Sequence, residues 1–429
     1  MSNLLQNSNF EIKSVVIKTQ AQKSNQRVSV GLDKSAVMQF EYNEGIYNKF
    51  LKVTLQIADT TNSISDQLFG MEEVEIVVKD LMHGVTYEFT SGSQNGPLYV
   101  YQIHSKRVID TGKIFVLELC RKDAIISMQK QVCKKYTSIT ADQLAGDILL
   151  TELGSKKPIR ATKSQNGLTF IPPNSRPYDV LVWARSKYFD DSQHSTSSKG
   201  KYSSAGYLFW ETYLAYNFKS VDEVCSQSTK SQTYTTGTGI GGLDEVYKIQ
   251  NLQMPQSLDM ISNFDRGFYS GTVEYFDLVN CEVKTESYNL KDNYSKWQKL
   301  GTNDNLPQLN SDVFSMEEPT RTMVVVYNDD LFLESKKDET KNKMKFVETV
   351  TQSIQRMGVF TGQVLEGTVM GNMMLNAGNI INVEFQDAVG GIDKNHSGRY
   401  IVFELRHIFS RERDQLKTQF VLVRDSFGV

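Results

Sequence analysis

The chain has 429 residues, with 47 Lys and Arg against 50 Asp and Glu, and a formal net charge of -3. A hydrophobic content of 39% with 23% charged residues is typical of a folded globular protein and excludes a largely disordered one. The near balance of charge gives no electrostatic footprint for nucleic-acid binding, and no apolar run is long enough to span a membrane. The first residues, MSNLLQNSNFEIKS, lack a basic region followed by an apolar core, so no secretory signal is expected.

The length predicts two to four domains. Strand patterns dominate residues 1–123, which we predict to form a first β tube module. The clearest pattern is FLKVTLQIAD at 50–59, where apolar and polar residues alternate strictly, as in a half-buried antiparallel strand.

Residues 124–205 are predicted to form a helix-rich insertion. Asp123 is placed to cap a helix over 124–136, Thr140 to cap a second over 141–153, and Pro177 to begin a third. The stretch 190–204 (DDSQHSTSSKGKYSS) is polar and rich in Ser, which predicts a loop exposed on the outside of the protein.

The remaining chain is predicted to return to strands. Residues 206–245 should hold an aromatic hairpin, a short helix capped by Ser220 and a flexible loop, and residues 246–358 peripheral strands, a loop and an amphipathic helix. Residues 359–429 form a second β tube module, which strands from 206–290 complete. The predicted fold class is mainly β with an α+β insertion, built on two related antiparallel β-barrel-like modules.

The end of the chain repeats a segment of its first quarter. Residues 98–123 (LYVYQIHSKRVIDTGKIFVLELCRKD) and 399–426 (RYIVFELRHIFSRERDQLKTQFVLVRDS) each give a Tyr-led strand, a basic and polar turn, and a second strand that ends on Arg and Asp. Upstream, Gly70 and Gly378 each precede a β-rich run. This pattern indicates duplication. A closed ring of such chains holds twice as many modules as subunits, so a trimer can face a six-fold partner. The interaction residues predicted from the two hairpins are Tyr99, Tyr101, Arg121, Asp123, Tyr400, Phe403, Arg424 and Asp425.

Patterns that would support catalysis are weak. The five histidines include no HExxH or HxH pair, and the four cysteines have no CxxC spacing, so neither a zinc site nor a disulfide framework is predicted. The run GTGIGG at 237–242 lacks the Lys-Ser or Lys-Thr of a phosphate loop. The adjacent acids Glu72 and Glu73 would point to opposite faces of a strand and could not flank one glycosidic bond. We therefore predict no catalytic residue, no metal ligand and no cofactor.

The order of these segments resembles the central baseplate hub of contractile phage tails, the T-even-type hub family, which is related to the base of type VI secretion spike proteins. The similarity is carried by the strands and loop at 50–78, the helices at 123–153, the Pro-Pro, helix and GYLFWET series at 167–211, the FKSVDEV turn at 218–224, and the C-terminal runs AGNIINV, GRYIVFELRHIF and FVLVRDS. The ordered series carries the resemblance, and no single motif decides it.

The resemblance implies a non-enzymatic virion protein of the phage tail baseplate, assembled in the host cytoplasm. Three chains would form a pseudo-six-fold cylinder that joins the hexameric tail tube to the trimeric spike and leaves a channel for DNA. The implied partners are the chain itself as a homotrimer, the spike, a tail tube or tube-initiator ring protein, and the baseplate wedge proteins, with the tape-measure protein as a further candidate. DNA would pass without sequence-specific binding, and any contact with an outer membrane would occur only through the spike.

Two other functions stay open at this point. One is a β-rich adhesin or glycan-binding virion protein, which clustered exposed Trp and Tyr would favour. The other is a tail-associated cell-wall hydrolase, although no carboxylate or Cys/His arrangement supports it.

Overall fold

A computed structural model gives the fold. It describes residues 9–20, 27–60, 64, 67–109, 112–190, 206–230, 232–237, 246–256, 260–277, 281–294, 297–301, 318–327, 339–360, 362–386 and 391–426. Most strands among these residues belong to one large sheet, and the helices are mostly short. The mainly β fold class predicted from the sequence is confirmed.

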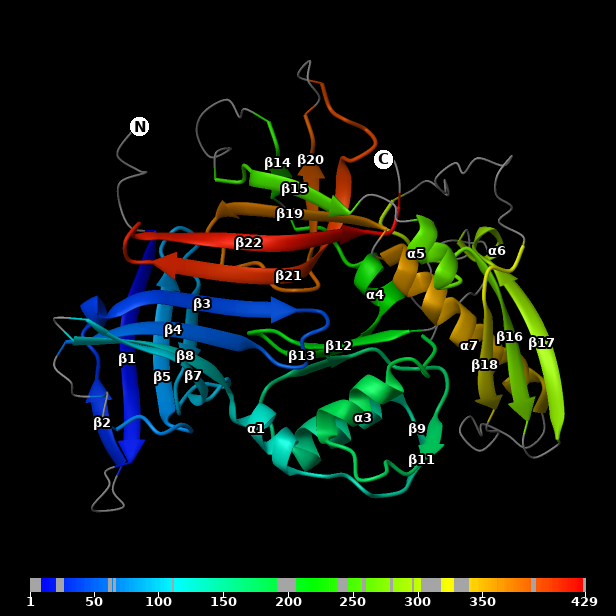
Figure 1. The fold of residues 1–429 in the computed structure, drawn as a ribbon, viewed down its shortest axis with the longest axis horizontal. Helices are drawn as coiled ribbons and strands as arrows, with labels where there is room; N and C mark the ends of the chain where they lie inside the picture. The colour runs from blue at the N-terminus through cyan, green and yellow to red at the C-terminus, as the bar shows by residue number, and fades with distance from the viewer. Residues whose placement is uncertain are drawn as a thin grey trace.

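The large sheet fills the left and upper middle part of the view in Figure 1. It has 14 strands, and its main path runs β15-β19-β22-β21-β3-β4-β8-β7-β5-β1-β2, with β6 on β5 and with β20 joining β14 to β21. Every pair is antiparallel except β14 with β20. The strands are β1 (Phe10–Gln20), β2 (Arg27–Gly31), β3 (Val37–Gly45), β4 (Lys52–Asp59), β5 (Glu73–Asp80), β6 (Thr86–Phe89), β7 (Leu98–Ile109), β8 (Gly112–Arg121), β14 (Thr233–Thr235), β15 (Gln250–Gln256), β19 (Gln363–Met370), β20 (Ile380–Glu384), β21 (Gly398–Ser410) and β22 (Gln415–Arg424).

Strand β4 shows why these residues form a sheet with one buried face. Val53, Leu55 and Ile57 are buried in the core, while the residues between them are only half-buried. Because successive side chains of a strand point to opposite faces, the alternation in the sequence places one apolar row under the sheet. The other face is therefore left to polar side chains. A short 3-10 helix, η1 (Lys34–Ala36), leads into β3.

The helical insertion follows β8. It contains α1 (Lys122–Gln129), β9 (Tyr136–Ile139), α2 (Ala141–Gly146), a π-helical turn η2 (Asp147–Glu152), β10 (Ile159–Ala161), β11 (Leu168–Phe170) and α3 (Pro177–Ala184). Thr140 forms the capping box of α2 with Gln143, and Pro177 begins α3, so both predicted helix starts are confirmed. The predicted cap at Asp123 is wrong. Asp123 lies inside the first turn of α1, because its carboxylate accepts hydrogen bonds from Ser155 and Tyr216 instead.

The aromatic hairpin lies beside the sheet. It consists of β12 (Tyr207–Glu211) and β13 (Tyr216–Ser220), and β10 pairs in parallel with β13. Ser220 caps α4 (Val221–Ser226) through the backbone N–H of Glu223, as predicted. Part of the segment predicted to be a flexible loop forms β14 instead, because Thr233–Thr235 pairs with β20.

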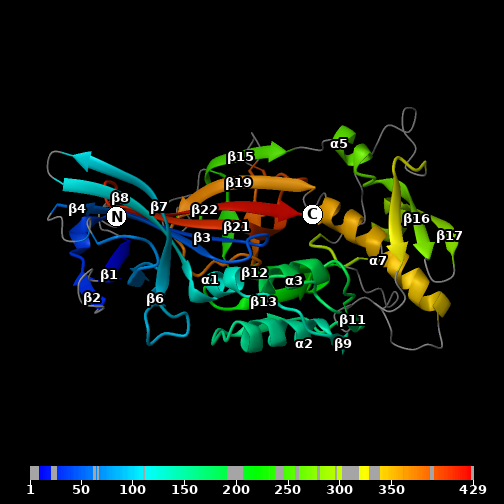
Figure 2. The ribbon, with the colours of Figure 1, turned by 60° about the horizontal axis from the view of Figure 1, so that its bottom comes forward.

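A second lobe lies at the other end of the molecule, where α7 packs against a small sheet (Figure 2). The lobe contains α5 (Met260–Asp265), β16 (Ser270–Asp277), β17 (Glu282–Asn289), α6 (Leu290–Tyr294), β18 (Thr322–Tyr327) and α7 (Glu339–Phe360). Strand β16 pairs antiparallel with β17 and parallel with β18. Helix α7 corresponds to the amphipathic helix predicted within residues 246–358.

The described strands of the two modules belong to one large sheet, so the barrel-like form predicted for each module stays a prediction. The predicted domain boundaries stay predictions. Most of the loop predicted at 190–204, and most of the GTGIGG run, lie outside the described residues.

Candidate assembly surface

The two repeated hairpins share the same strand pairing. The register of β7 against β8 shifts immediately after Val100, and the register of β21 against β22 shifts immediately after Val402. The extra residues are Tyr101 and Phe403, and each forms a β-bulge. A bulge at the same place in both hairpins makes Tyr101 the structural counterpart of Phe403.

Strands β5 and β20 lie at equivalent places beside the two hairpins, and the residues just before them have the same backbone geometry. The backbone N–H of Met71 donates to the carbonyl of Val100 at 2.7 Å, and Val100 donates to the residue after Met71 at 3.0 Å. Gly378 and Val402 are joined by the same two bonds, at 2.8 and 2.9 Å. Met71 has a φ of 68° and Gly378 a φ of 87°, so both occupy the left-handed region. The upstream match noted in the sequence therefore extends to backbone geometry, with Met71 rather than Gly70 as the counterpart of Gly378.

The equivalence extends over five strands. Strand β4 lies on β8 and β3 on β4, just as β19 lies on β22 and β15 on β19. We call β3, β4, β8, β7 and β5 the first repeat, and β15, β19, β22, β21 and β20 the second repeat. The alignment puts Leu98, rather than Tyr99, in the place of Tyr400, and Arg121 in the place of Arg424.

The two repeats are joined edge to edge by β21 and β3. Their antiparallel pairing runs from Glu404 opposite Gly45 to Ser410 opposite Gln39. Phe409 and Phe40 lie opposite each other and both pack against Phe10. The sheet therefore continues without interruption from one repeat to the other.

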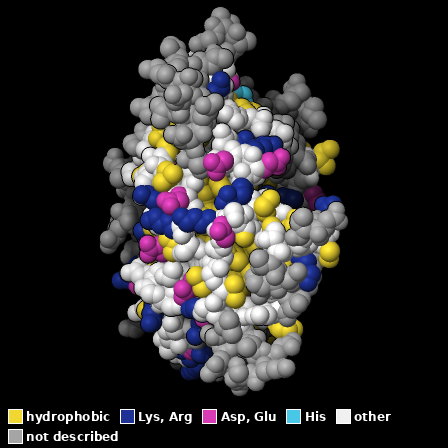
Figure 3. All heavy atoms as spheres, turned by 90° about the vertical axis from the view of Figure 1, so that its left-hand side faces the viewer, with side chains coloured by type: hydrophobic (Ala, Val, Ile, Leu, Met, Phe, Trp, Pro, Cys, Tyr) yellow, Lys and Arg dark blue, Asp and Glu magenta, His cyan; other side chains and the backbone are white. Residues whose placement is uncertain are grey.

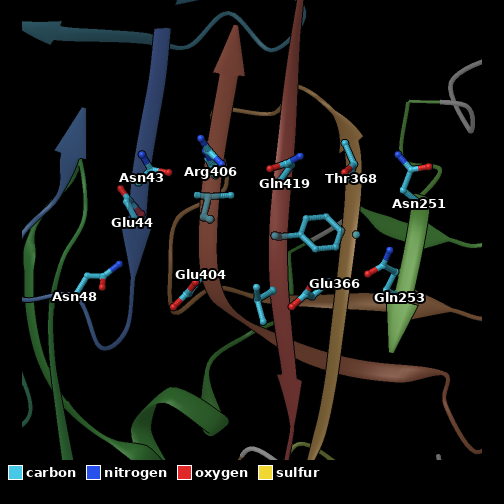
Figure 4. A pocket seen from close by; sticks show the side chains of 14 residues that line it. Asn43, Glu44, Asn48, Asn251, Gln253, Glu366, Thr368, Glu404, Arg406 and Gln419 are labelled. Atoms are coloured by element: carbon cyan, nitrogen blue, oxygen red, sulfur yellow. The ribbon is translucent and has the colours of Figure 1, made fainter. Parts of the chain in front are cut away.

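The face of the sheet turned away from the core carries a polar hollow of about 530 Å³ across the second repeat and the junction. Figure 4 shows its lining: Asn43, Arg406, Gln419 and Thr368 follow one another from strand to strand, with Asn251 on β15 beyond them. The glutamate side chains of Glu366 on β19 and Glu404 on β21 lie in the same hollow. Since these groups carry both signs of charge, the surface is hydrated and has no strong preference for anions or cations.

Arg121, one of the predicted residues, belongs to a buried charge cluster. Its Nη1 donates to Glu211 Oε1 at 2.8 Å and lies 3.2 Å from Asp123, while Lys157 Nζ lies 2.9 Å from the same Glu211 oxygen. Burial alone would raise the pKa of Glu211, but the two cations outweigh it and hold that pKa below its ordinary value. Burial lowers the pKa of Lys157 to about 8. Glu211 also accepts the backbone N–H of Leu51 at 3.1 Å, so the cluster fixes the first repeat to the insertion and to β12.

The end of the second hairpin anchors a different part of the chain. Arg424 Nη1 donates to the carbonyl of Ser397 at 2.8 Å, and its guanidinium lies 5.5 Å from the centre of the Tyr400 ring. Asp425 is fully buried and forms an ion pair with Arg356 of α7 at 3.0 Å. The second hairpin is therefore fixed to the second lobe.

The predicted residues thus form two separate groups, one at each hairpin. Tyr101 and Phe403 lie at the bulges, where Tyr101 donates to Glu118 and Phe403 packs edge-on against Tyr47. Tyr99 is half-buried next to the first bulge. Sequence reasoning missed Lys157 and Arg356, because a single cation far from its partner in the sequence gives no signal. Glu211 could have been found, since it stands in the GYLFWET run.

Two buried titratable groups lie near the junction of the repeats. Burial raises the pKa of the Glu44 carboxyl to about 7, against hydrogen bonds donated by the N–H groups of Tyr213 at 2.6 Å and Ala377 at 2.9 Å. Burial lowers the pKa of His407 to about 4, and its Nδ1 lies 2.8 Å from Thr418 Oγ1. Both groups are buried inside the protein, where they hold neighbouring segments together.

Side chains that could support chemistry have structural partners instead. Glu72 accepts the N–H groups of Phe69 and Gly70 at 2.6 and 2.9 Å, whereas Glu73 forms an ion pair with Lys18 at 2.6 Å. Within the described ranges, no group of three or more His, Cys, Asp and Glu could hold a metal ion. None of the described helices is both long and apolar enough to cross a membrane.

The fold is similar to those of solved structures of tail proteins. No protein-family model matches the chain, and no curated protein does. Among solved structures, the tail protein from Neisseria meningitidis MC58 is similar, with 11% identity, a TM-score of 0.54, and coverage of 96% of this chain and 97% of that one. The 43 kDa tail protein of prophage MuSo2 from Shewanella oneidensis is similar with 10% identity, a TM-score of 0.52, and coverage of 96% and 99%. The chain therefore has the fold of these tail proteins over nearly its whole length, and the resemblance drawn from the sequence is confirmed at the level of the fold.

Proposed function

We propose that the chain is the structural central hub of a contractile phage tail baseplate. In this proposal three copies form a cylinder with pseudo-six-fold symmetry that joins the hexameric tail tube to the trimeric spike. The observation that carries the proposal is the edge-to-edge fusion of two equivalent repeats in one sheet. The likeness of the whole chain to the two tail proteins supports it.

The proposed mechanism is adaptation between two symmetries. The backbones of the two repeats match, so a trimer would present six similar units to a six-fold ring. What is attached to each repeat differs, because the first is fixed to the helical insertion through Glu211 and the second to α7 through Asp425. The same trimer would therefore present only three-fold symmetry at its periphery, which suits a trimeric spike.

The polar face of the sheet is the proposed wall of the DNA channel. Its Glu, Arg, Asn and Gln side chains keep a channel hydrated, and the mixture of charges gives no net attraction for phosphates. DNA would therefore pass without being held.

The ends of the sheet strands are the proposed contact regions for the ring and spike partners. The end shown in Figure 3 has Lys and Arg interspersed with Asp and Glu around hydrophobic atoms, which is the composition of a specific polar contact. The tube or tube-initiator ring, the wedge proteins and the tape-measure protein belong to this proposal as partners.

An enzymatic role is not part of the proposal. Glu44 and Lys157, whose pKa values burial shifts toward neutrality, are both buried and form hydrogen bonds or ion pairs that hold strands together. A glycan-binding role gains no support either, because Trp210 and Trp297 are buried and only Trp183 is exposed.

Native mass spectrometry of the purified chain tests the proposal. We expect a homotrimer at micromolar concentration, and electron micrographs of the same sample should show a ring with a central hole about as wide as a DNA duplex. A stable monomer or dimer, unchanged when the spike protein is added, would contradict the proposal.

A further inference from the structure

The corresponding edges of the two repeats are covered differently. After its bulge, β21 pairs with β22 on one side and with β3 on the other, from Glu404 to Ser410. The corresponding part of β7, residues 102–109, pairs with β8 on one side. On its other side, β5 reaches β7 only at Leu98 and Tyr99, and no strand of the described residues continues that pairing.

A strand that matches β3 exists, and among the described strands it pairs on one side only. Strand β15 occupies the place of β3 in the second repeat and pairs with β19, which makes it the last strand of the sheet path. Strand β15 is the first strand of the sheet path and β7 is the eighth, and β5, β1 and β2 continue the sheet beyond Leu98 and Tyr99 of β7. One repeat therefore has an uncovered edge, and the other has a strand of the kind that covers that edge.

The exposed fractions of equivalent side chains differ in the way that an uncovered edge of β7 would produce. Phe409 on β21 is 3% exposed, because β3 and Phe10 cover it, whereas its counterpart Val108 on β7 is 72% exposed. On β15, Met254 is 45% exposed. An apolar side chain on an uncovered edge strand promotes pairing with another chain, and natural proteins avoid it unless the edge is used.

We infer that β15 of one copy pairs antiparallel with residues 102–109 of β7 in a second copy and so repeats the β3–β21 junction between subunits. The occupant of the β7 edge is thus a second copy of this chain, chosen because the chain already contains the same junction in covalent form. The inference rests on the proposed trimer. The contact joins two different surfaces, and such contacts generate rings when the rotation closes.

The covalent junction also fixes the register. Glu41 lies opposite Thr54, and Gln253 lies opposite Glu366, which is the counterpart of Thr54. Gln253 is therefore the counterpart of Glu41. The register of β15 shifts on both sides of Gln253, and we place the first shift at Asn251, whose φ is 51°, so that Leu252 takes the place of Phe40.

On β7, a second bulge at His104 adds one residue, which brings Val108 to the place of Phe409. Because Phe40 faces Phe409 within one chain, Leu252 of one copy should face Val108 of the next.

The size of the resulting wall is suitable for a channel. Eight strands of each chain, from β15 to β7, would line it, so a trimer would have about 24 strands spaced about 4.8 Å apart. The circumference is then about 115 Å and the backbone diameter about 37 Å before strand tilt is considered. After inward-pointing side chains are included, the opening still exceeds the width of a DNA duplex.

Disulfide trapping in the full chain tests the register. The double variant Val108→Cys with Leu252→Cys, in a background where the exposed Cys133 and Cys281 are Ser, should give covalent dimers and trimers on mild oxidation. The matched control is Val108→Cys with Met254→Cys. It moves the second thiol two residues along β15, about 7 Å or more from the position opposite Val108, and should give little cross-linking.

The outcomes separate the inference from the proposed function. A native trimer without cross-links in the first variant, or with equal cross-linking in both, would overturn the register and leave the hub proposal standing. A monomer in native mass spectrometry would overturn both. If the variants fail to fold, hydrogen exchange of the unmodified trimer decides: slow exchange along 102–109 and 250–256 supports the pairing, and exchange as fast as in an uncovered strand contradicts it.

Discussion

The first and second repeats have the same backbone plan but different surroundings. Each has a left-handed residue before its first strand, a bulge after an equivalent valine, and an Arg at the end of its hairpin. They differ in what they contact. Met71 is 51% exposed, whereas Gly378 lies against the indole of Trp210. The comparison teaches that backbone geometry outlasts side-chain identity after a duplication, since the hydrogen-bond pattern depends little on side chains.

The difference also shows how one chain can have two kinds of edge. In the second repeat, β21 pairs with β3 of the first repeat within the same chain, and this edge carries the large, buried, apolar Phe409. The first repeat has no such neighbour among the described residues, and its edge carries Val108. Substitutions at equivalent positions should therefore have unequal effects on a single chain.

The largest difference in the free energy of unfolding is expected between variants at Phe409 and Val108. Phe409→Ala should lower the free energy of unfolding by about 3–5 kcal/mol, because it removes a buried ring packed 4.6 Å from Phe10 and leaves a cavity. Val108→Ala should change it by less than about 0.5 kcal/mol in a dissociated chain, because an exposed side chain loses little on truncation. Urea unfolding at protein concentrations low enough for dissociation measures both.

Similar losses at the two positions would show that the edge of β7 is covered within one chain. The two repeats would then not differ in how their equivalent edges are covered.

The next inequality is expected at the left-handed positions. A Cβ on Gly378 would lie 2.5 Å from Trp210 Cζ2 at a φ of 87°, so Gly378→Ala combines backbone strain with overpacking and should cost about 2–4 kcal/mol. Met71→Ala keeps a Cβ that the backbone already accommodates and should cost less than about 0.5 kcal/mol. Thermal unfolding of the two variants compares them directly, and equal melting temperatures would count against the close approach of Trp210.

Sequence patterns predicted the elements whose cause is local. Strict alternation of apolar and polar residues predicted β4, Thr140 predicted the start of α2, and Ser220 predicted the start of α4. The duplication was visible because each hairpin ends on Arg and Asp, but the sequence aligned Tyr99 with Tyr400. The structural alignment depends on where the bulges lie. A bulge adds one residue to a strand and leaves its composition almost unchanged, so the sequence pattern does not reveal it.

What depends on distant contacts could not be predicted. The pairing of β21 with β3 joins residues more than 350 positions apart, and neither strand contains a sequence pattern that specifies its partner strand. The same holds for Lys157 and Arg356, whose role comes from the carboxylates they meet in the fold.

The smallest effect is expected from histidine. His407 is buried, and burial lowers its pKa to about 4 from an ordinary value near 6.5, against the nearby Asp80 carboxylate, which acts in the opposite direction. Between these two pH values the unfolded chain binds more protons than the folded one, so this group makes stability fall as the pH drops through that window. From pH 7 to pH 5 its contribution should fall by about 2 kcal/mol.

His407→Gln should remove that part of the pH dependence, measured as the difference between the unfolding free energies of variant and parent at each pH. The matched control is His104→Gln at the second bulge of β7, where the imidazole is 51% exposed and pairs with Glu118. The His407 difference should shrink as the pH falls, because the parent loses stability that the variant keeps. A difference that stays constant from pH 7 to pH 5 would mean that the imidazole is already solvated in the folded chain, and with it that the second repeat is less tightly closed at its junction with β3 than the geometry shows.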